Sequence, residues 1–334
     1  MDKLLFTLNV VLPIILPIFL GYSLKRIGFL KEEFLNGINK LVFVVLLPVL
    51  LFSNIYLADL STINWAFCGI AAIAIFALFG VGLIVVLFIK DPKQKGVMLQ
   101  ASFRSNYAII GIPLATLIGG DEAGAQAAVV AAISVPLFNM LAVIALSMFD
   151  KTEDNKIDIK RMLFKIVTNP LIIGVVSGVL VCLIGLWIDA GTGNSRVLYQ
   201  IVNKNDGTVK FIGTTIDYIG RCATPMALLV LGGKFEFSAV KKLWPQLTIS
   251  VTLRLIITPT VMLIIFYLIG YRTKTDFAIL IALFATPIAV SSVPMAAQMG
   301  QDEELAGQIV VWTSALSAFS LFFIILICSL IGIF

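Results

Sequence analysis

Apolar segments of about 20 residues recur along the whole chain and are separated by short polar loops. A segment of that length crosses the hydrocarbon core of a bilayer, which is roughly 30 Å thick, as one helix. Lipid cannot hydrogen-bond the backbone, so only helices and closed barrels span a membrane. With 60% hydrophobic and 13% charged residues, the chain also has too few polar groups to cover a soluble surface. The sequence therefore predicts an all-α, polytopic membrane protein.

The segmentation predicts ten transmembrane helices joined mostly by short loops. The two longest loops are residues 150–161, which are charged, and residues 189–210, which are polar and rich in Gly and Asn. The first apolar run lacks a cleavage site and is predicted to be a retained helix. The predicted spans are residues 4–24, 34–56, 63–89, 96–118, 123–149, 162–188, 211–233, 244–270, 276–298 and 304–332.

The distribution of Lys and Arg predicts how these spans are oriented. Fifteen of the 24 basic residues lie in or beside the loops that follow odd-numbered spans, and six lie on the opposite side. Because cytoplasmic loops carry the excess of basic residues, both termini are expected outside the cytoplasm. We therefore expect a multi-pass protein of the plasma (inner) membrane, with loop 150–161 in the cytoplasm.

The two halves of the chain resemble each other in the order of their Pro, Gly and Trp residues. The matched pairs are Pro13 with Pro170, Gly21 with Gly178, Pro48 with Pro225, Trp65 with Trp244, and Pro113 with Pro294. Each half holds five predicted spans, and an odd number forces the second copy to insert upside down. The sequence thus predicts two inverted five-helix repeats, residues 1–150 and 162–334, joined by a cytoplasmic linker, residues 151–161. Secondary transporters commonly have this architecture and hold substrate where the repeats meet.

The fourth and ninth predicted spans carry helix-disrupting residues at matched positions. Proline removes a helical hydrogen bond, and unwound backbone at membrane depth is tolerated only beside protein or a water-filled cavity. A kinked, tightly packed helix is one interpretation, and a broken helix that contributes to a substrate site is the other. The residues concerned are Gly111, Pro113, Pro287, Ser291, Ser292 and Pro294.

Three arginines lie inside predicted spans: Arg104, Arg221 and Arg254. A charge at that depth normally faces the bundle interior or a cavity and has a partner. Asp217 precedes Arg221 by one helical turn, so these two side chains can form an ion pair. Carbonyl groups at helix ends could satisfy Arg104 and Arg254, but the excess positive charge also favours an anionic substrate held by arginine.

Several polar side chains complete the candidate substrate site. Asn106 stands beside Arg104, and Asn54, Asn139 and Gln298 lie in neighbouring spans. Each of them alone is as compatible with a helix–helix hydrogen bond. The residues predicted to bind substrate are Arg104, Asn106, Gly111, Pro113, Ser291, Ser292, Pro294, Arg254 and Asn54, with Asp217 and Arg221 as a coupling or ion-pair set.

Three segments resemble the auxin efflux carrier family, which includes plant PIN exporters and bacterial organic-acid permeases. They are SNYAIIGIPL at residues 105–114, SSVPMAAQMG at residues 291–300, and VVLPIILPIFLGYSLKRIGFL at residues 10–30. The similarity extends over essentially the whole chain. It implies a scaffold and a transport set of helices, with broken helices 4 and 9 crossing as in bile acid symporters and sodium–proton antiporters. It also implies a homodimer, and Asn106, Pro113 and Pro294 as crossover residues.

The resemblance implies a transporter of a small organic anion, such as malate or an auxin-like acid. The shortness of loop 150–161 and the Ser291–Ser292 pair depart from the plant members and favour a small carboxylate. A sodium-coupled symporter of the bile acid type and a ligand sensor that transports nothing are the alternatives. No enzymatic activity, cofactor, metal site or nucleic-acid partner is expected: the chain has no His, and its four Cys lie in apolar segments. The expected partners are the anion and the bilayer.

Overall fold

The computed structural model describes residues 2–53, 55–56, 64–149, 164, 167–194, 196–203, 205, 207–235 and 238–334. Every regular element in these residues is helical. The first half contains α1 (Asp2–Arg26), α2 (Glu32–Leu41), η1 (Val42–Leu46), α3 (Leu47–Ser53), α4 (Trp65–Leu87), α5 (Pro92–Phe103), η3 (Tyr107–Gly111) and α6 (Ile112–Ser147). The second half contains α8 (Pro170–Thr192), α9 (Val197–Val202), α10 (Lys210–Arg221), α11 (Ala223–Lys234), α12 (Ser238–Thr252), η4 (Leu253–Ile257), α13 (Thr258–Leu268), α14 (Lys274–Phe284), α15 (Ser292–Gln298) and α16 (Glu303–Leu330).

Six helical stretches in the described residues are long and apolar enough to cross a membrane. They coincide with six of the ten predicted spans, which confirms the all-α membrane class. Two of the other four predicted spans are interrupted in the structure, between α5 and η3 and between α14 and α15. The six stretches are Glu32–Ser53, Trp65–Leu87, Glu122–Ser147, Pro170–Thr192, Val240–Leu268 and Glu303–Leu330.

Polar side chains at the membrane boundaries start several of these helices. Asp91 accepts a hydrogen bond from the Lys93 N–H at the start of α5, and Asn169 accepts one from the Leu171 N–H at the start of α8. Asp302 accepts one from the Leu305 N–H and begins α16. Such caps satisfy N–H groups that have no partner in the first helical turn.

In the part of the chain that the structure describes, three short π-helical segments, labelled η, lie inside the helical spans, and each ends two residues before a proline. They precede Pro48, Pro113 and Pro259. Proline has no N–H, and its ring pushes against the carbonyl of the preceding turn. A wider π turn relieves that contact, and such turns often lie at functional sites. The positions of the prolines therefore determine where these helices widen. η3 contains Gly111 and η4 contains Arg254, two of the residues that the sequence predicts for the substrate site.

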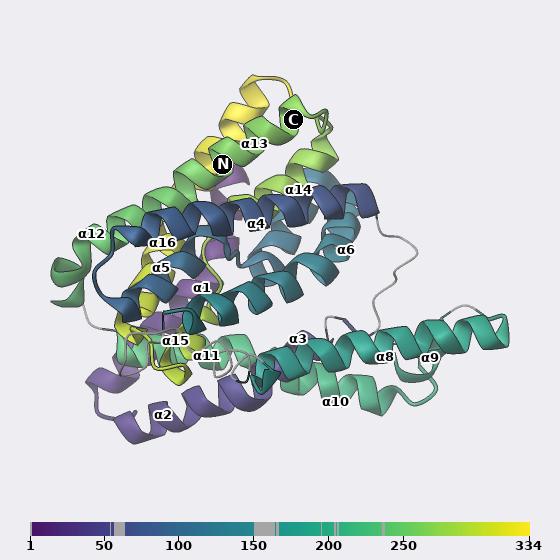
Figure 1. The fold of residues 1–334 in the computed structure, drawn as a ribbon, viewed down its shortest axis with the longest axis horizontal. Coiled ribbons are helices and arrows are strands. Elements are labelled where there is room, and N and C mark those ends of the chain that lie inside the picture. The colour runs from purple at the N-terminus through teal and green to yellow at the C-terminus, as the bar shows by residue number, and fades with distance from the viewer. Residues whose placement is uncertain are drawn as a thin grey trace.

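The elements pack into two helix sets. The first set comprises α1, α2, η1, α3, α8, α9, α10 and α11, and the second set comprises the remaining helices. Within the first set α1 packs on α11 and α3 packs on α8 and α10, whereas within the second set α14 packs on α6 and α4 on α5. Figure 1 shows α3, α8, α9 and α10 as a layer along one side of the molecule.

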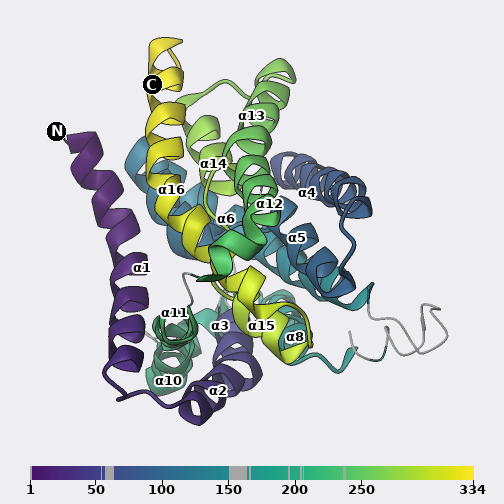
Figure 2. The ribbon, with the colours of Figure 1, turned by 90° about the vertical axis from the view of Figure 1, so that its left-hand side faces the viewer.

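The two helix sets meet along α1, which packs on α16, and around α15. Figure 2 shows that the chain ends of α1 and α16 lie toward the same end of the molecule. An even number of spans places both termini on one side of the membrane, and the arrangement is compatible with the ten that the sequence predicts.

The structure corrects one detail of the predicted spans. The helix breaks do not lie at Pro113 and Pro294, because Pro113 lies in the first turn of α6 and Pro294 lies within α15. At Pro113 the π turn η3 precedes the ring and runs directly into α6, so the helix continues through the proline. The boundary predicted between spans four and five agrees with the structure, because Gly120 has a non-helical backbone (φ 81°, ψ −174°) and divides α6 into two helices. The predicted linker, residues 151–161, lies outside the described residues.

Candidate functional site

The two helix breaks lie against each other in the interior of the molecule. The first is the non-helical segment Arg104–Asn106 that follows α5, and the second, residues 285–291, follows α14. The Asn106 N–H donates to the carbonyl oxygen of Pro287 at 2.8 Å, and the Ser105 and Thr286 hydroxyls lie 2.5 Å apart. The two segments thus use each other to satisfy polar groups that a broken helix leaves without partners.

A cavity of about 250 Å³ lies between these breaks and the first helix set. Its walls come from α3, from the first break and η3, from α6, from α10 and α11, and from the second break. The lining residues are Leu47, Leu50, Leu51, Arg104, Ser105, Asn106, Tyr107, Ala108, Val135, Phe138, Asn139, Gly220, Arg221, Ala223, Thr224, Ala227, Ala289, Val290 and Ser291. This mixture of an apolar wall and a few converging polar groups is typical of a site for a small ligand.

Arg104 lines the cavity at the C-terminal end of α5 and is 1% exposed. Its Nη1 donates to Gln100 Oε1 at 3.0 Å and contacts Met295 Sδ, and its Nη2 donates to Asn139 Oδ1 and Ser291 Oγ, both at 2.7 Å. All these partners are neutral, and Arg104 forms no ion pair with any carboxylate in the described residues. Its positive charge is therefore held in place but not neutralised.

Asn106 lies beside Arg104 at the start of η3 and is 3% exposed. Its Nδ2 has no hydrogen-bond partner, and its side chain does not cap η3. A buried amide without a partner is unfavourable, so its retention points to a ligand that accepts the hydrogen bond. The first turn of the η3–α6 helix also begins here, and a helix N-terminus carries partial positive charge.

Arg254 lies on η4, is completely buried, and does not line the cavity. Its Nε donates to the Thr286 carbonyl oxygen at 2.8 Å, Nη1 to the Phe103 carbonyl oxygen at 3.4 Å, and Nη2 to the Leu283 carbonyl oxygen at 3.4 Å. The arginine thus joins the C-terminal end of α5 to that of α14. Of the two interpretations that the sequence left open, the structure favours helix-end carbonyls for Arg254 and the cavity for Arg104.

Asp217 and Arg221 form the ion pair that their spacing predicts. Asp217 Oδ2 lies 2.8 Å from Arg221 Nε, along α10. Arg221 lines the cavity and its side chain is 69% exposed, whereas Asp217 does not line it. The acid therefore compensates Arg221 from outside the cavity, and Arg104 supplies the positive charge that is left over inside it.

The structure brings together only some of the residues that the sequence predicts for the site. Arg104, Asn106, Ser291 and Arg221 line the cavity, as does Asn139. Asn54 lies outside the described residues. The residues that do not line the cavity are Gly111, Pro113, Ser292, Pro294, Arg254 and Gln298. Gly111 serves packing instead, since a Cβ there would lie 2.9 Å from the Ala282 carbonyl oxygen of α14.

Ser105, Tyr107 and Thr224 line the cavity but were not predicted to do so. The signal for Ser105 and Tyr107 was present, because both flank Asn106 in the sequence. Nothing in the sequence around Thr224 distinguishes it from other polar residues near a helix end. It reaches the cavity because α11 packs opposite the breaks.

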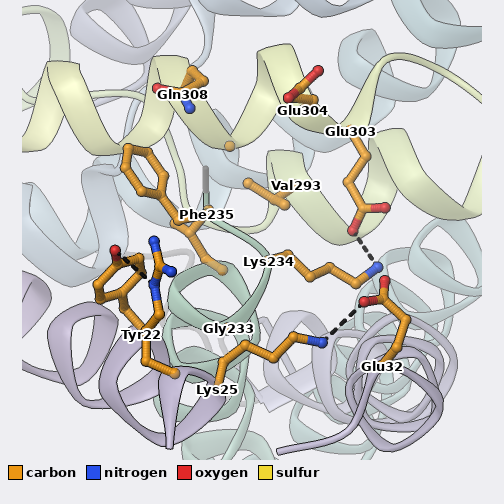
Figure 3. Close-up of a pocket in the computed structure, with 13 residues that line it drawn as sticks. Tyr22, Lys25, Glu32, Gly233, Lys234, Phe235, Val293, Glu303, Glu304 and Gln308 are labelled. Atoms are coloured by element: carbon orange, nitrogen blue, oxygen red, sulfur yellow. Dashed lines mark hydrogen bonds and ion pairs between the residues drawn. The ribbon is translucent and has the colours of Figure 1, made fainter. Parts of the chain in front are cut away.

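Figure 3 shows the residues that line a second, larger cavity of about 740 Å³. It lies between α1, α2 and α11 of the first set and α15 and α16 of the second. Four of its six charged side chains form ion pairs: Lys25 Nζ lies 3.0 Å from Glu32 Oε2, and Lys234 Nζ lies 2.8 Å from Glu303 Oε1. The other two are Arg26, whose Nε donates to the Tyr22 hydroxyl at 3.0 Å, and Glu304. This lining holds three basic and three acidic residues, whereas that of the smaller cavity holds two arginines and no acidic residue, so the smaller cavity is the better candidate for an anion.

Two comparisons place the chain among known proteins. A family model described as "Membrane transport protein" matches residues 6–325. An uncharacterized transporter of Methanothermobacter thermautotrophicus is 26% identical over 315 residues, which cover 93% of this chain and 95% of that protein. Both similarities extend over the two breaks and the cavity between them.

Proposed function

The chain belongs to the membrane transport protein family of the auxin efflux carriers, and from this premise we propose that it carries a small organic anion across the plasma membrane. The family makes it a membrane transporter and leaves its substrate open. The proposed substrate is a mono- or dicarboxylate, such as malate or an auxin-like acid. The proposed site is the 250 Å³ cavity at the two helix breaks.

The observation that carries this proposal is the uncompensated guanidinium of Arg104 in the cavity wall. A carboxylate would neutralise it and accept charge-assisted hydrogen bonds, which are about twice as strong as neutral ones. The unpaired Asn106 Nδ2 and the helix start at η3 offer further donors on the same wall. The volume lies just below the usual range for ligand pockets, about 300 to 1,000 Å³, which favours a small substrate.

The proposed mechanism is alternating access by two inverted repeats, residues 1–150 and 162–334. In its support, α1 packs on α11 while α8, its counterpart in the second half, packs on α3. The matched glycines serve these contacts: Gly21 faces the Leu229 carbonyl of α11, and Gly178 faces the Phe52 carbonyl of α3. The two cavities are related in the same way, because the larger adjoins α2 and α11 and the smaller adjoins their counterparts, α10 and α3.

In the proposed orientation the smaller cavity opens outward and the larger one inward, with both termini outside the cytoplasm. Lys25, Arg26 and Lys234, which line the larger cavity, then lie on the cytoplasmic side, as the excess of basic residues there requires. Movement of the second helix set against the first would expose the breaks to each cavity in turn. The few contacts between the sets, apart from that of α1 with α16, suit such movement.

The proposal is tested with purified protein in liposomes that contain no other protein. A thermal-unfolding screen against mono- and dicarboxylates comes first, because a ligand that binds only the folded state raises its apparent stability. Uptake of each stabilising acid is then measured against protein-free liposomes. Specific uptake supports a transporter. Binding without flux would instead favour the alternative, a membrane sensor.

Replacing Asn106 by alanine is expected to lower uptake by about 10-fold or more without lowering the unfolding temperature. Its Nδ2 has no partner in the protein, so its removal breaks no hydrogen bond of that group. A hydrogen bond to a charged ligand contributes about 1.5 to 3 kcal/mol, and each 1.4 kcal/mol is a factor of ten in affinity. Uptake rates and unfolding temperatures of the variant and the parent protein check this.

Gln301→Ala provides the matched control for Asn106. Its Oε1 is likewise buried without a partner, but the residue follows α15 and does not line the cavity. Its replacement should leave uptake within about twofold of the parent protein. Equal uptake by the Asn106 variant would remove that residue from the site.

A further inference from the structure

Two helices end at the buried point where the breaks meet. α5 ends at Phe103 and α14 at Phe284, so the last carbonyl groups of both are directed toward this region. The C-terminal end of a helix carries roughly half a negative charge, and its last four carbonyls have no partner within the helix. Two such ends brought together inside a membrane protein require a positive charge.

Arg254 supplies that charge from a third segment, η4. Its guanidinium donates to one carbonyl of α5, to one of α14, and to the Thr286 carbonyl of the second break. Its side chain is completely buried and forms no ion pair with a carboxylate in the described part of the chain. The carbonyls are therefore its counter-charge, and Arg254 is not available to hold a substrate.

Carbonyl oxygens at unwound segments and helix C-terminal ends are the ligands with which transporters of this general architecture coordinate a coupling cation. Here the hydroxyls of Ser105 and Thr286 stand at the same breaks, 2.5 Å apart, and would add two more oxygen ligands. The set of oxygen atoms suits a small monovalent cation. The guanidinium of Arg254 contacts the carbonyls of this set.

We infer that Arg254 is a built-in substitute for a coupling cation, so that the carrier moves its anion without sodium or another monovalent metal ion at the breaks. This inference concerns how the proposed transport is coupled to a cation, and to that extent it rests on the proposed function. The position of the Arg254 charge at the breaks does not depend on which anion is the substrate. It also distinguishes the protein from a sodium-coupled symporter, the alternative that the sequence left open.

The test compares the thermal unfolding of the detergent-solubilised parent protein, Arg254→Ala and Arg254→Lys in NaCl, KCl and choline chloride of equal ionic strength. The parent protein should unfold at the same temperature in all three salts. Arg254→Ala should unfold about 6 °C lower or more in choline chloride, because three buried carbonyl groups lose their hydrogen-bond donor. Sodium or low-millimolar methylguanidinium should recover a large part of that loss, because either can enter the vacated site.

Arg272→Ala is the matched control, because its side chain is exposed and its Nε donates to the Tyr267 carbonyl oxygen, a single helix-end carbonyl far from the breaks. That variant should respond to no cation. If Arg254→Ala does not fold, Arg254→Lys decides: it keeps a positive charge, so its unfolding temperature should not differ between sodium and choline. A sodium-specific rise in the parent protein or in Arg254→Lys would overturn the inference. So would an Arg254→Ala variant that folds and responds to no cation, because the arginine would then act only as a hydrogen-bond clamp.

Uptake by the parent protein gives the second measurement. Replacement of sodium by choline on both sides of the liposome membrane should leave the initial rate of anion uptake within about twofold. A rate that requires sodium contradicts the inference while supporting the proposed function. A complete absence of flux contradicts the proposed function alone, and the unfolding measurements then decide the inference.

Discussion

Replacing Arg104 by glutamine is expected to lower uptake of the anion by about 100-fold or more. The guanidinium is the uncompensated positive charge of the cavity wall, and glutamine removes the charge while keeping a polar side chain. Loss of one partner from a buried, hydrogen-bonded charge pair costs about 2 to 5 kcal/mol or more, and 2.8 kcal/mol is a factor of 100. Initial uptake rates in liposomes, at equal amounts of inserted protein, measure the effect.

The variant should still fold, because each partner of Arg104 in the structure is neutral and none is left as an unpaired charge. Arg104→Lys, which keeps the charge but not the fork of donors, should retain more uptake than Arg104→Gln. Arg272→Gln changes an exposed arginine in the same way and should leave uptake unaltered. Undiminished uptake by a folded Arg104→Gln variant would contradict the site assignment.

Replacing Gly232 by alanine is expected to destabilise the protein severely and to prevent much of it from folding. Gly232 of α11 packs against the backbone of α1, and a Cβ at this position would overlap the Ile18 carbonyl group. Because the obstruction is backbone, the two helices must separate. Inserting one carbon into a well-packed contact costs about 1 to 3 kcal/mol or more, which corresponds to an unfolding temperature lower by roughly 2 to 12 °C or more. The unfolding temperature and the yield of monodisperse protein in detergent are the measurements.

Gly80 offers the same substitution in an open position. It lies within α4, and a Cβ there meets no atom within 4 Å. Gly80→Ala should leave the unfolding temperature unchanged or raise it slightly, because alanine favours a helix interior by about 1 kcal/mol relative to glycine. Similar unfolding temperatures for Gly80→Ala and Gly232→Ala would show that the contact of α1 with α11 tolerates adjustment.

The spans could be predicted from the sequence because bilayer thickness fixes the length of an apolar helix and lipid forbids other backbone conformations. Six predicted spans are confirmed, and the other four coincide with α1, with the α5–η3 and α14–α15 segments that contain the breaks, and with the pair α10 and α11. The exact places of the breaks could not be predicted. Pro113 and Pro294 disrupt a preceding turn, but the chain resumes its helix before or at each proline and opens further upstream.

Asn106 was predicted as a site residue from the sequence, through its place in the segment SNYAIIGIPL. Its unpaired amide in the cavity wall agrees with that interpretation. Thr224 could not be found in the same way. Its position in the wall depends on how α11 lies across the breaks, which no local pattern in the chain records.

The sequence by itself determined that this is a helical membrane protein, that its fourth and ninth apolar segments are interrupted, and that buried arginines need an explanation. Apolar length and proline chemistry are local properties, and they can be read one segment at a time. The roles of Arg104 and Arg254 were decided only by the tertiary structure, because both are arginines near the middle of an apolar segment. The packing of α5, η4, α14 and the second break turns Arg254 toward helix-end carbonyls and Arg104 toward a cavity. A buried charge takes its function from the groups that surround it, and those come from distant parts of the chain.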